Sequence, residues 1–346
     1  MKKSMVSAAV LALAIGTGPV NAATLAQVEQ LGKLIYESTL LSWNQTQSCA
    51  TCHSAAAGFA DLENSAVSLG DDGISTGGRN APTSAYCGFS PILHLNQAGE
   101  YVGGMFWDGR ATGLRLHDPL AEQAQGPPLN PVEMNMPDAQ TVIDRLAGDP
   151  TIAPLFTSVY GMDAFADTNL AYDNLARAVA AYERSAEVTG FTSRFDAGTL
   201  NGQELRGKKL FMQKCTTCHA MARRGGGHPL FTNYKYVNAG VPMNPALAAD
   251  PNCAYQYPDL GLGGFLGDPA QNGKFKVPTL RNIALTGPYS HNGYFATLKE
   301  MVSFMNDRRA FTPEVAENLS PAVGNLGLTD TQVNDIVTFL NALTDK

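Results

Sequence analysis

The sequence predicts a mainly α-helical protein of two domains with long loops. Three observations support this fold class: a length of 346 residues with 44% hydrophobic residues, helical periodicity in separate segments, and one cysteine motif that occurs twice. A chain of this length is expected to form about two domains at roughly 150 residues each. No segment is rich in the polar and apolar alternation that is typical of strands.

The N-terminus has the pattern of a secretory signal peptide, which we assign to residues 1–23. Two lysines precede an apolar run at residues 5–15, and small residues offer cleavage after Ala22 or Ala23. The alternative is a membrane anchor, but the run is too short to span about 30 Å of hydrocarbon. We therefore expect an exported, periplasmic protein without a later membrane span.

A Cys-x-x-Cys-His motif occurs in "SCATCHSA" at residues 48–55 and again in "KCTTCHAM" at residues 214–221. Zinc would need further ligands, and an adjacent Cys and His are poorly placed to share one tetrahedral ion. A redox dithiol needs no histidine. Covalent haem c uses every position, because the two thiols bond to the haem and the imidazole ligates its iron. The predicted attachment residues are Cys49, Cys52 and His53 for the first haem, and Cys215, Cys218 and His219 for the second.

Amphipathic helices are predicted next to both motifs. The apolar positions before the first motif are Leu25, Val28, Leu31, Leu34 and Ile35, and a similar helix from Glu204, with Leu205, Lys208, Leu210 and Phe211, precedes the second. Residues 168–188 form another predicted helix, and a last one follows an N-cap at Thr329. The motif histidines are 166 residues apart, which suits two fused cytochrome c-like haem domains. We expect these domains at residues 24–190 and 191–346, with the crossing near residues 190–198.

The net charge bears on whether the chain binds nucleic acid, and the two cysteines outside the motifs bear on whether it forms a disulfide. With a net charge of −7 and no basic cluster, the chain is not expected to bind nucleic acid. Six cysteines in an oxidising compartment must be accounted for, and four belong to the motifs. The simplest account joins Cys87 and Cys253 in a disulfide, and the alternative is two separate buried thiols.

Seven segments, in order, resemble those of the bacterial diheme cytochrome c peroxidases and of MauG, their relative that matures methylamine dehydrogenase. The resemblance covers nearly the whole mature chain and is carried by "SCATCH", "RNAPT", "FWDGRA", "AEQAQGPPLNPVEM", "AAYERSAEVTGFTSRFD", "LRGKKLF…KCTTCH" and "FKVPTLRNIALTGPYSHNGYFATLKEMVSFM". The resemblance implies that Glu133 is the catalytic acid–base group for peroxide. Gln123 is implied to line the same pocket, and Trp107 to relay electrons between the haems.

The resemblance also implies ligands for the second haem and for a cation. Met305 matches the axial methionine of the peroxidases, whereas MauG has tyrosine there, and Met301 lies on the same helical face. The side chain of Asn80 and the backbone carbonyls of Lys276 and Pro278 match a calcium site between the domains. One Ca²⁺ and two covalent haems are therefore the expected cofactors.

The chain departs from the peroxidase pattern at the first haem. Many peroxidases have a removable histidine ligand where this chain has Asp72, so the first haem is expected to be open at all times, as in MauG. His94 and His117 are alternative ligands, and His291 is expected to be structural. The segment from Trp107 to Gln123 is longer than usual. The surface tryptophan of MauG has no counterpart, because Gln213 takes that position, although Trp43 or a tyrosine remains an alternative oxidation site.

Three functions from different classes follow. The first is an enzyme that reduces hydrogen peroxide with electrons from a small periplasmic cytochrome c or copper protein. The second is a MauG-like oxidase that uses peroxide to modify tryptophan or tyrosine on a partner protein. The third is an electron carrier without chemistry, which Glu133 and Gln123 argue against. Met305 favours the peroxidase and Asp72 favours the modifying oxidase. A homodimer is one assembly that the sequence leaves open.

Overall fold

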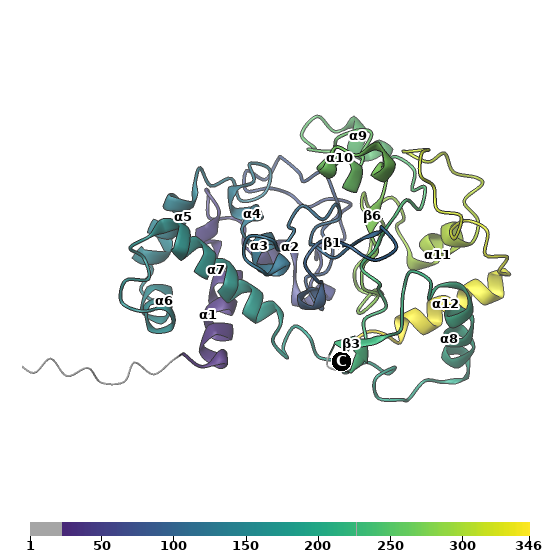
Figure 1. Cartoon of the computed structure of the whole chain (residues 1–346), viewed down its shortest axis with the longest axis horizontal. Helices are drawn as coiled ribbons and strands as arrows, with labels where there is room; N and C mark the ends of the chain where they lie inside the picture. Colours follow the sequence, from purple (N-terminus) through teal and green to yellow (C-terminus); the bar gives the residue numbers. More distant parts are fainter. Residues whose placement is uncertain (1–22, 226) are drawn as a thin grey trace, which may run out of the picture.

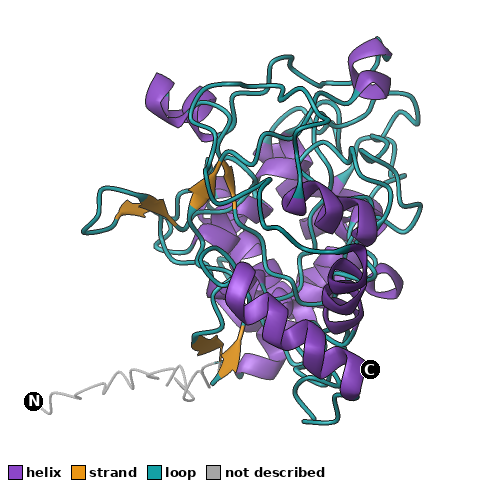
Figure 2. Cartoon of the chain, turned by 90° about the vertical axis from the view of Figure 1, so that its right-hand side faces the viewer, coloured by secondary structure: helices purple, strands orange, loops and turns teal. Residues whose placement is uncertain are grey.

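The structure, a computed structural model, describes residues 23–225 and 227–346. Helices and long loops make up most of this part, and its strands pair into three two-stranded antiparallel sheets (Figure 2). The α-helices are α1 (Leu25–Glu37), α2 (Cys49–Cys52), α3 (Pro119–Ala124), α4 (Gly126–Leu129), α5 (Ala139–Gly148), α6 (Ile152–Tyr160), α7 (Thr168–Glu183), α8 (Gly202–Lys214), α9 (Pro245–Ala249), α10 (Leu262–Leu266), α11 (Leu298–Asn306) and α12 (Asp330–Asn341). The strands are β1 (His94–Leu95), β2 (Tyr101–Val102), β3 (Arg223–Gly225), β4 (His228–Pro229), β5 (Tyr236–Val237) and β6 (Phe275–Lys276). Four short 3₁₀ helices are η1 (Thr39–Leu41), η2 (Ala55–Ala57), η3 (Cys87–Phe89) and η4 (Pro269–Gln271). The predicted mainly α fold class is confirmed.

The predicted signal peptide lies outside the described residues, apart from Ala23. Between residues 23 and 346, residue 226 excepted, no helix is long and apolar enough to cross a membrane.

Helices α1 and α7 form the scaffold of the N-terminal half, on the left of Figure 1. Thr24 caps α1 through a capping box with Gln27, and Leu31 and Ile35 are fully buried. A Cβ on Gly32 would lie 1.9 Å from the Ala178 carbonyl oxygen, so the two helices cross in close contact only because this position is glycine. The predicted helix before the first motif is confirmed.

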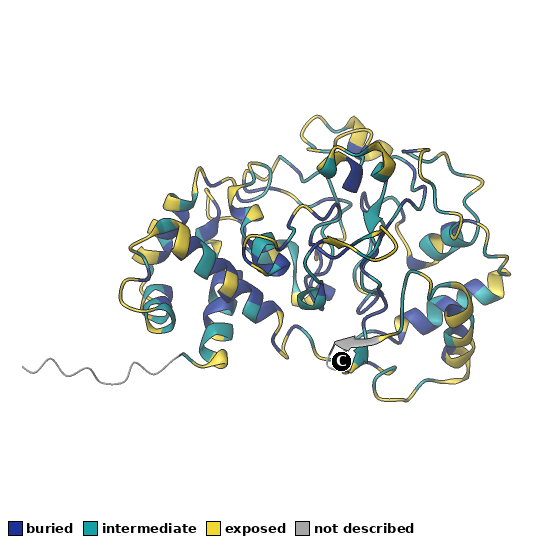
Figure 3. Ribbon diagram, in the orientation of Figure 1, coloured by how far each residue is buried: buried dark blue, intermediate teal, exposed yellow. Residues whose placement is uncertain are grey.

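The C-terminal half repeats this arrangement with α8 and α12. A Cβ on Gly207 would lie 1.9 Å from the Asp335 carbonyl oxygen, which is the same kind of close crossing. Thr329 caps α12 as predicted, and its buried positions include Val333, Ile336 and Leu340. The main hydrophobic cores follow the same division, one around α1 and α7 and one around α8 and α12, visible as dark blue faces in Figure 3.

Long loops from the two halves meet in the centre of the molecule (Figure 1). Val102 forms a bridge with Lys235, and Thr76 forms one with Cys253. The β6 residue Lys276 donates its backbone N–H to the Trp107 carbonyl at 2.9 Å. Backbone hydrogen bonds between distant segments therefore fix these loops. The exact division into domains at residues 190 and 191 remains a prediction.

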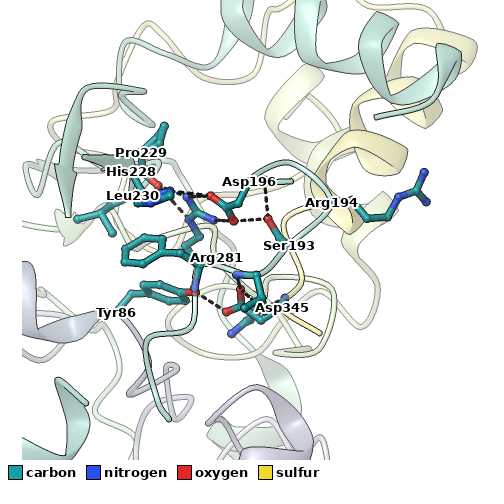
Figure 4. Close-up of polar contacts among 12 residues, drawn as sticks. Tyr86, Ser193, Arg194, Asp196, His228, Pro229, Leu230, Arg281 and Asp345 are labelled. Carbon is teal, nitrogen blue, oxygen red and sulfur yellow. Dashed lines mark hydrogen bonds and ion pairs between the residues drawn. The ribbon is translucent and has the colours of Figure 1, made fainter. Parts of the chain in front are cut away.

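A buried polar cluster around Arg281 also joins the two halves (Figure 4). Arg281 is fully buried and donates to both carboxylate oxygens of Asp196, at 2.5 and 3.0 Å. Asp196 lies in the segment that connects α7 to α8, and the Arg281 guanidinium lies 5.6 Å from the ring centroid of Tyr86 in the N-terminal half. The Tyr86 hydroxyl donates to Asp345 near the C-terminus. One arginine thus links both halves and their connection.

Two predicted helices differ in detail from the structure. Helix α7 ends at Glu183 rather than at residue 188, because Arg184 is its C-cap and the Ser185 N–H turns back to the Tyr182 carbonyl. Val188 is buried although it lies beyond the helix, which explains why the apolar pattern continued. In α8, Leu205 is 51% exposed and only Glu204, Gly207 and Phe211 are buried.

The structure contradicts the predicted disulfide between Cys87 and Cys253, since both are free thiols. The Cys87 thiol donates to the Thr83 carbonyl at 3.1 Å, inside the centre of the molecule. The Cys253 thiol donates to the Gly77 carbonyl at 3.3 Å, on the loop that pairs with Thr76. The number of cysteines in a sequence does not show where the loops place them in the fold. The structure agrees with the alternative of two separate thiols.

Candidate functional site

Two cavities lie on either side of one wall in the centre of the molecule. The first cavity, of about 440 Å³, contains the first cysteine motif, and the second cavity, of about 290 Å³, contains the second motif. The residues that line both cavities form what we call the shared wall: Asn80, Pro82, Thr83, Cys87, Met105, Phe106, Trp107 and Asp259. The fold therefore places the two motifs in adjacent chambers.

The first motif forms the short helix α2, and His53 is its C-cap. The His53 Nδ1 lies 3.3 Å from the Phe59 carbonyl oxygen, so this nitrogen carries the proton and donates. Burial lowers the pKa of His53, although the carbonyl groups of Phe59 and Pro82 act in the opposite direction. The ring is therefore neutral, with Nε2 left as the electron-pair donor that a metal requires.

The second motif is held in the same way at the end of α8. Cys215 is the C-cap of α8, and the His219 N–H donates to its carbonyl at 2.9 Å. The His219 Nδ1 donates to the Phe231 carbonyl at 2.8 Å. Burial again lowers the pKa of this histidine. Both histidines thus present Nε2 from a fixed ring.

A Pro-Thr pair supports each histidine from the loop that faces it. The Thr83 hydroxyl donates to the Gly58 carbonyl at 2.7 Å, and the Thr279 hydroxyl donates to the Leu230 carbonyl at 2.8 Å. In each half the accepting residue directly precedes the phenylalanine that holds the histidine ring. The two sites are therefore built on one plan, which agrees with two related haem domains.

Glu133 lines the first cavity from the loop that follows α4. Burial raises the pKa of Glu133, while the charge of Arg110 and a hydrogen bond from Asn130 lower it. The Asn130 side-chain amide donates to Glu133 Oε1 at 2.8 Å. The Glu133 backbone carbonyl accepts the Asp71 N–H at 2.7 Å, so the loop position is fixed. The result is a carboxyl group that can take up and release a proton inside the cavity.

Gln123 lines the same cavity from α3, whose N-cap is Asp118. The structure therefore brings Gln123, Glu133 and His53 together in one cavity, and the roles that the resemblance implies for them stay predictions. The carboxamide can both donate and accept a hydrogen bond, which suits a small oxygen ligand such as peroxide.

Asp72, which replaces the removable histidine of the peroxidases, and the alternative ligands His94 and His117 do not line the first cavity. Asp72 is exposed, and its carboxylate accepts from the Ile74 and Ser75 N–H groups of its own turn. His94 and His117 are exposed on the surface and line neither cavity. In this structure, none of these three side chains lies in the cavity that Gln123 and Glu133 line.

Trp107 occupies the shared wall and donates its indole N–H to the Asn80 carbonyl at 2.9 Å. Arg110, from the same loop, lies over the Phe106 ring at 3.7 Å. Trp107 thus lies between the two cavities, and the electron-relay role that the resemblance implies for it stays a prediction.

Sequence reasoning assigned no role to a group of charged residues beside this wall. Arg79 donates to both carboxylate oxygens of Asp259, at 2.7 and 2.8 Å, and to Asp108 at 2.6 Å. Arg110 also pairs with Asp108 at 2.9 Å. Both arginines occur in the quoted "RNAPT" and "FWDGRA" segments, but only the fold shows that they meet.

The predicted calcium ligands Asn80, Lys276 and Pro278 all line the second cavity. The Asn80 amide nitrogen donates to the Ala66 carbonyl at 3.2 Å, which leaves its Oδ1 as the oxygen for a cation. No cluster of three or more His, Cys, Asp or Glu side chains suited to a metal occurs in residues 23–225 and 227–346. A cation here would therefore depend on amide and carbonyl oxygens.

The axial ligand of the second site is not decided by the cavity lining. Met301 and Met305 lie on α11 and both line the second cavity. His291 lines this cavity too, but its ring stacks on Phe275 at 3.6 Å and its Nε2 lies 3.8 Å from a Glu314 oxygen. This arrangement agrees with a structural role for His291.

Comparison with known proteins shows which family models, relatives and solved structures the chain resembles. Residues 26–204 match the family model of di-haem cytochrome c peroxidases, and residues 205–344 match that of cytochrome c. The methylamine utilization protein MauG of Paracoccus denitrificans is 40% identical, over 91% of this chain and 88% of that protein. The cytochrome c551 peroxidase of Pseudomonas aeruginosa is 30% identical, over 92% of this chain and 79% of that protein. The crystal structure of the diheme peroxidase BthA from Burkholderia thailandensis has a TM-score of 0.79 at 28% identity, and covers 94% of this chain and 89% of that chain.

The chain belongs to the di-haem cytochrome c peroxidase family, which also includes MauG. Each cavity fits a covalently bound haem c, because it combines two thiols with a neutral histidine that has a free Nε2. The lining of the second cavity is mainly apolar, with Leu280, Ile336 and Leu340 among its residues. Two haem c groups are therefore the cofactors of this chain.

Proposed function

We propose that this protein reduces hydrogen peroxide to water at the first site, in the periplasm, with electrons from a small cytochrome c or copper protein. The observation that carries the proposal is that Glu133 and Gln123 share one cavity with His53. Peroxide reduction needs a proton-transferring group next to the reacting oxygens, and an electron carrier does not.

A haem held by His53 would supply the redox chemistry, and the chain would control the protons. The reaction is H₂O₂ + 2H⁺ + 2e⁻ → 2H₂O. Because burial raises the pKa of Glu133 and Arg110 opposes this, the carboxyl group can accept a proton from one peroxide oxygen and return it to the other. Gln123 would orient the peroxide by hydrogen bonds from its amide.

The absence of Asp72, His94 and His117 from the lining of the first cavity supports direct access of peroxide. Many peroxidases of the family have a removable ligand at the position of Asp72, and here that side chain accepts hydrogen bonds within its own turn. We therefore propose that the first site reacts without prior reduction of the second.

The second site would store the electron and pass it through the shared wall. We propose Met305 as its axial ligand, with Met301 as a packing residue, because a thioether opposite histidine raises the reduction potential. Trp107 would act as the electron relay, since it alone among the tryptophans lines both cavities. A Ca²⁺ held by Asn80, Lys276 and Pro278 would support this region.

The experiment compares wild type with Glu133→Gln and Glu63→Gln, which alters an exposed carboxyl group. Peroxide consumption is measured with a reduced small cytochrome c or copper protein as donor, and haem content is determined for each variant. Glu133→Gln is expected to lower turnover by about 10²–10⁴-fold with both haems retained, and Glu63→Gln to have no effect. Unchanged turnover in Glu133→Gln would remove Glu133 from the mechanism.

A second candidate is the peroxide-dependent oxidation of a partner protein. The identity of 40% to MauG favours it, as does the exposed Asp72 in place of a ligand. The test incubates the enzyme and peroxide with an exported protein from the same gene neighbourhood and records its mass. Gain of oxygen or loss of hydrogen at Trp or Tyr supports this function, whereas oxidation of the small donor without such a change supports the first.

A further inference from the structure

Glu183 is a buried carboxylic acid in the wall of the first cavity. The proposed mechanism uses Glu133 and Gln123 and does not use Glu183. It is the last residue of α7 and is only 3% exposed. Val179, one helical turn earlier, lines the same cavity. The acid thus faces the chamber that contains Glu133 and His53.

The surroundings of Glu183 do not provide a partner for its charge. Its Oε2 has no hydrogen-bond partner among the described residues. The nearby cation Arg184 is exposed and pairs with Asp118 at 2.6 Å. The charges of Arg184 and Asp118 act on Glu183, and the charge of Glu183 acts on Tyr36, Cys49, Cys87 and Tyr182.

Burial raises the pKa of Glu183 to about 8, although the charge of Arg184 acts in the opposite direction. A carboxylate without a partner is unfavourable in such a place, so the group holds a proton at neutral pH. Glu183 and Glu133 both raise the pKa of Cys49, which indicates that both acids lie near this cysteine. The cavity therefore contains two carboxyl groups, Glu133 and Glu183.

We propose that Glu183 is a second proton-donating residue of the first cavity, which supplies a proton to an oxygen atom of the peroxide reduced there. This inference rests on the proposed function. The two-electron reduction of one H₂O₂ to two H₂O consumes two protons, whereas Glu133 moves a proton between the two oxygens. Glu183 releases one of the two consumed protons, and the other comes from solvent. Glu183 becomes a carboxylate and regains a proton from solvent before the next turnover.

The test uses the haem-loaded protein with Glu183→Gln and, as matched control, Glu187→Gln. Glutamine keeps the shape of the side chain but cannot release a proton. Glu187 is a neighbouring exposed acid that contacts Lys33 and Tyr182 and not the cavity. Infrared spectra at several pH values detect the C=O band of a protonated carboxyl group, and peroxide reduction is measured over the same pH range.

In wild type and Glu187→Gln, we expect a carboxylic acid band at pH 7 that disappears as the pH rises through about 8, with activity falling in parallel. Activity falls because a deprotonated Glu183 has no proton to give. Glu183→Gln should lack this band, react about 10²-fold more slowly at pH 7, and lose the alkaline decline.

An unchanged rate and pH profile in Glu183→Gln would overturn the inference. If that variant does not fold, the infrared spectra of Glu133→Gln serve instead. The band that titrates near pH 8 must persist in Glu133→Gln if it belongs to Glu183. Absence of the band in Glu133→Gln would also overturn the inference. The infrared result does not depend on turnover. If wild type fails to reduce peroxide while the band is present, it is the proposed function that fails, and with it the proton donation.

Discussion

His53 and His219 show how single residues define the two sites. Each ring donates Nδ1–H to the carbonyl of a phenylalanine, Phe59 or Phe231, and each of these phenylalanines has a positive φ angle, near 63° and 54°. A left-handed conformation is unusual for phenylalanine, and here it belongs to the turn whose carbonyl holds the histidine. The carbonyl contact fixes the tautomer and leaves Nε2 for iron.

Methionine substitution tests the assignment of the axial ligand. Met305→Leu removes the thioether and is expected to lower the reduction potential of the second haem by on the order of 100 mV, since axial ligands set haem potentials over about 0.8 V. Met301→Leu is the matched control on the same helix and should leave the potential nearly unchanged. A spectroscopic redox titration measures both, and the opposite pattern would make Met301 the ligand.

The functional role of a residue could be predicted from the sequence where the residue belongs to a local motif. The role of an isolated residue could not. The spacing of Cys49, Cys52 and His53 defines haem attachment by itself. Glu183 stood in a quoted segment, "AAYERSAEV", but was given no role. The sequence did offer one signal for it: Glu183 follows Val179 by four positions, which places a charged residue on the apolar face of a predicted helix.

At the scale of elements, close helix crossings set the geometry of both halves. Glycine occurs at the crossing in α1 and in α8, where any Cβ would overlap a carbonyl oxygen of the facing helix. The motifs follow α1 and α8, so these crossings determine where the haem-binding residues lie. The helices themselves were predictable because their apolar periodicity and caps are local. The end of α7 was not, because the buried Val188 continues the pattern after the backbone has turned.

A glycine substitution tests the crossing of α8 with α12. Gly207→Ala places a methyl group 1.9 Å from the Asp335 carbonyl oxygen, so we expect a loss of about 1–3 kcal/mol in the free energy of unfolding. Gly202→Ala, in the first turn of the same helix, meets no atom within 4 Å and should not destabilise the protein. Chemical denaturation followed by circular dichroism measures both, and equal stability of the two variants would contradict the crossing.

At the scale of the whole molecule, loops distant in sequence join the two halves around the cavities. Composition did not predict these contacts, as the incorrect disulfide between Cys87 and Cys253 shows. The resemblance of the quoted segments located the site residues along the chain. It did not show that Trp107 and Asp259 lie in the wall shared by both cavities, which only the fold reveals.

Arg281 tests the connection between the halves. Arg281→Met leaves Asp196 buried without its main cationic partner, so we expect a loss of about 3–5 kcal/mol in the free energy of unfolding. Arg309→Met is the control, because Arg309 is 86% exposed in its pair with Asp307 and should change stability by less than about 1 kcal/mol. Thermal or chemical unfolding of the haem-loaded variants measures the difference. A loss in Arg281→Met no larger than in the control would show that this cluster does not hold the halves together.

We propose that the first site is open and reacts with peroxide directly. The decisive measurement mixes the fully oxidised, haem-loaded protein with hydrogen peroxide in a stopped-flow spectrophotometer, without any reductant. We predict a high-spin ferric spectrum before mixing and an immediate spectral change at the first haem, strongly slowed in Glu133→Gln. A purely low-spin spectrum, with no reaction until the second haem is reduced, would contradict the account.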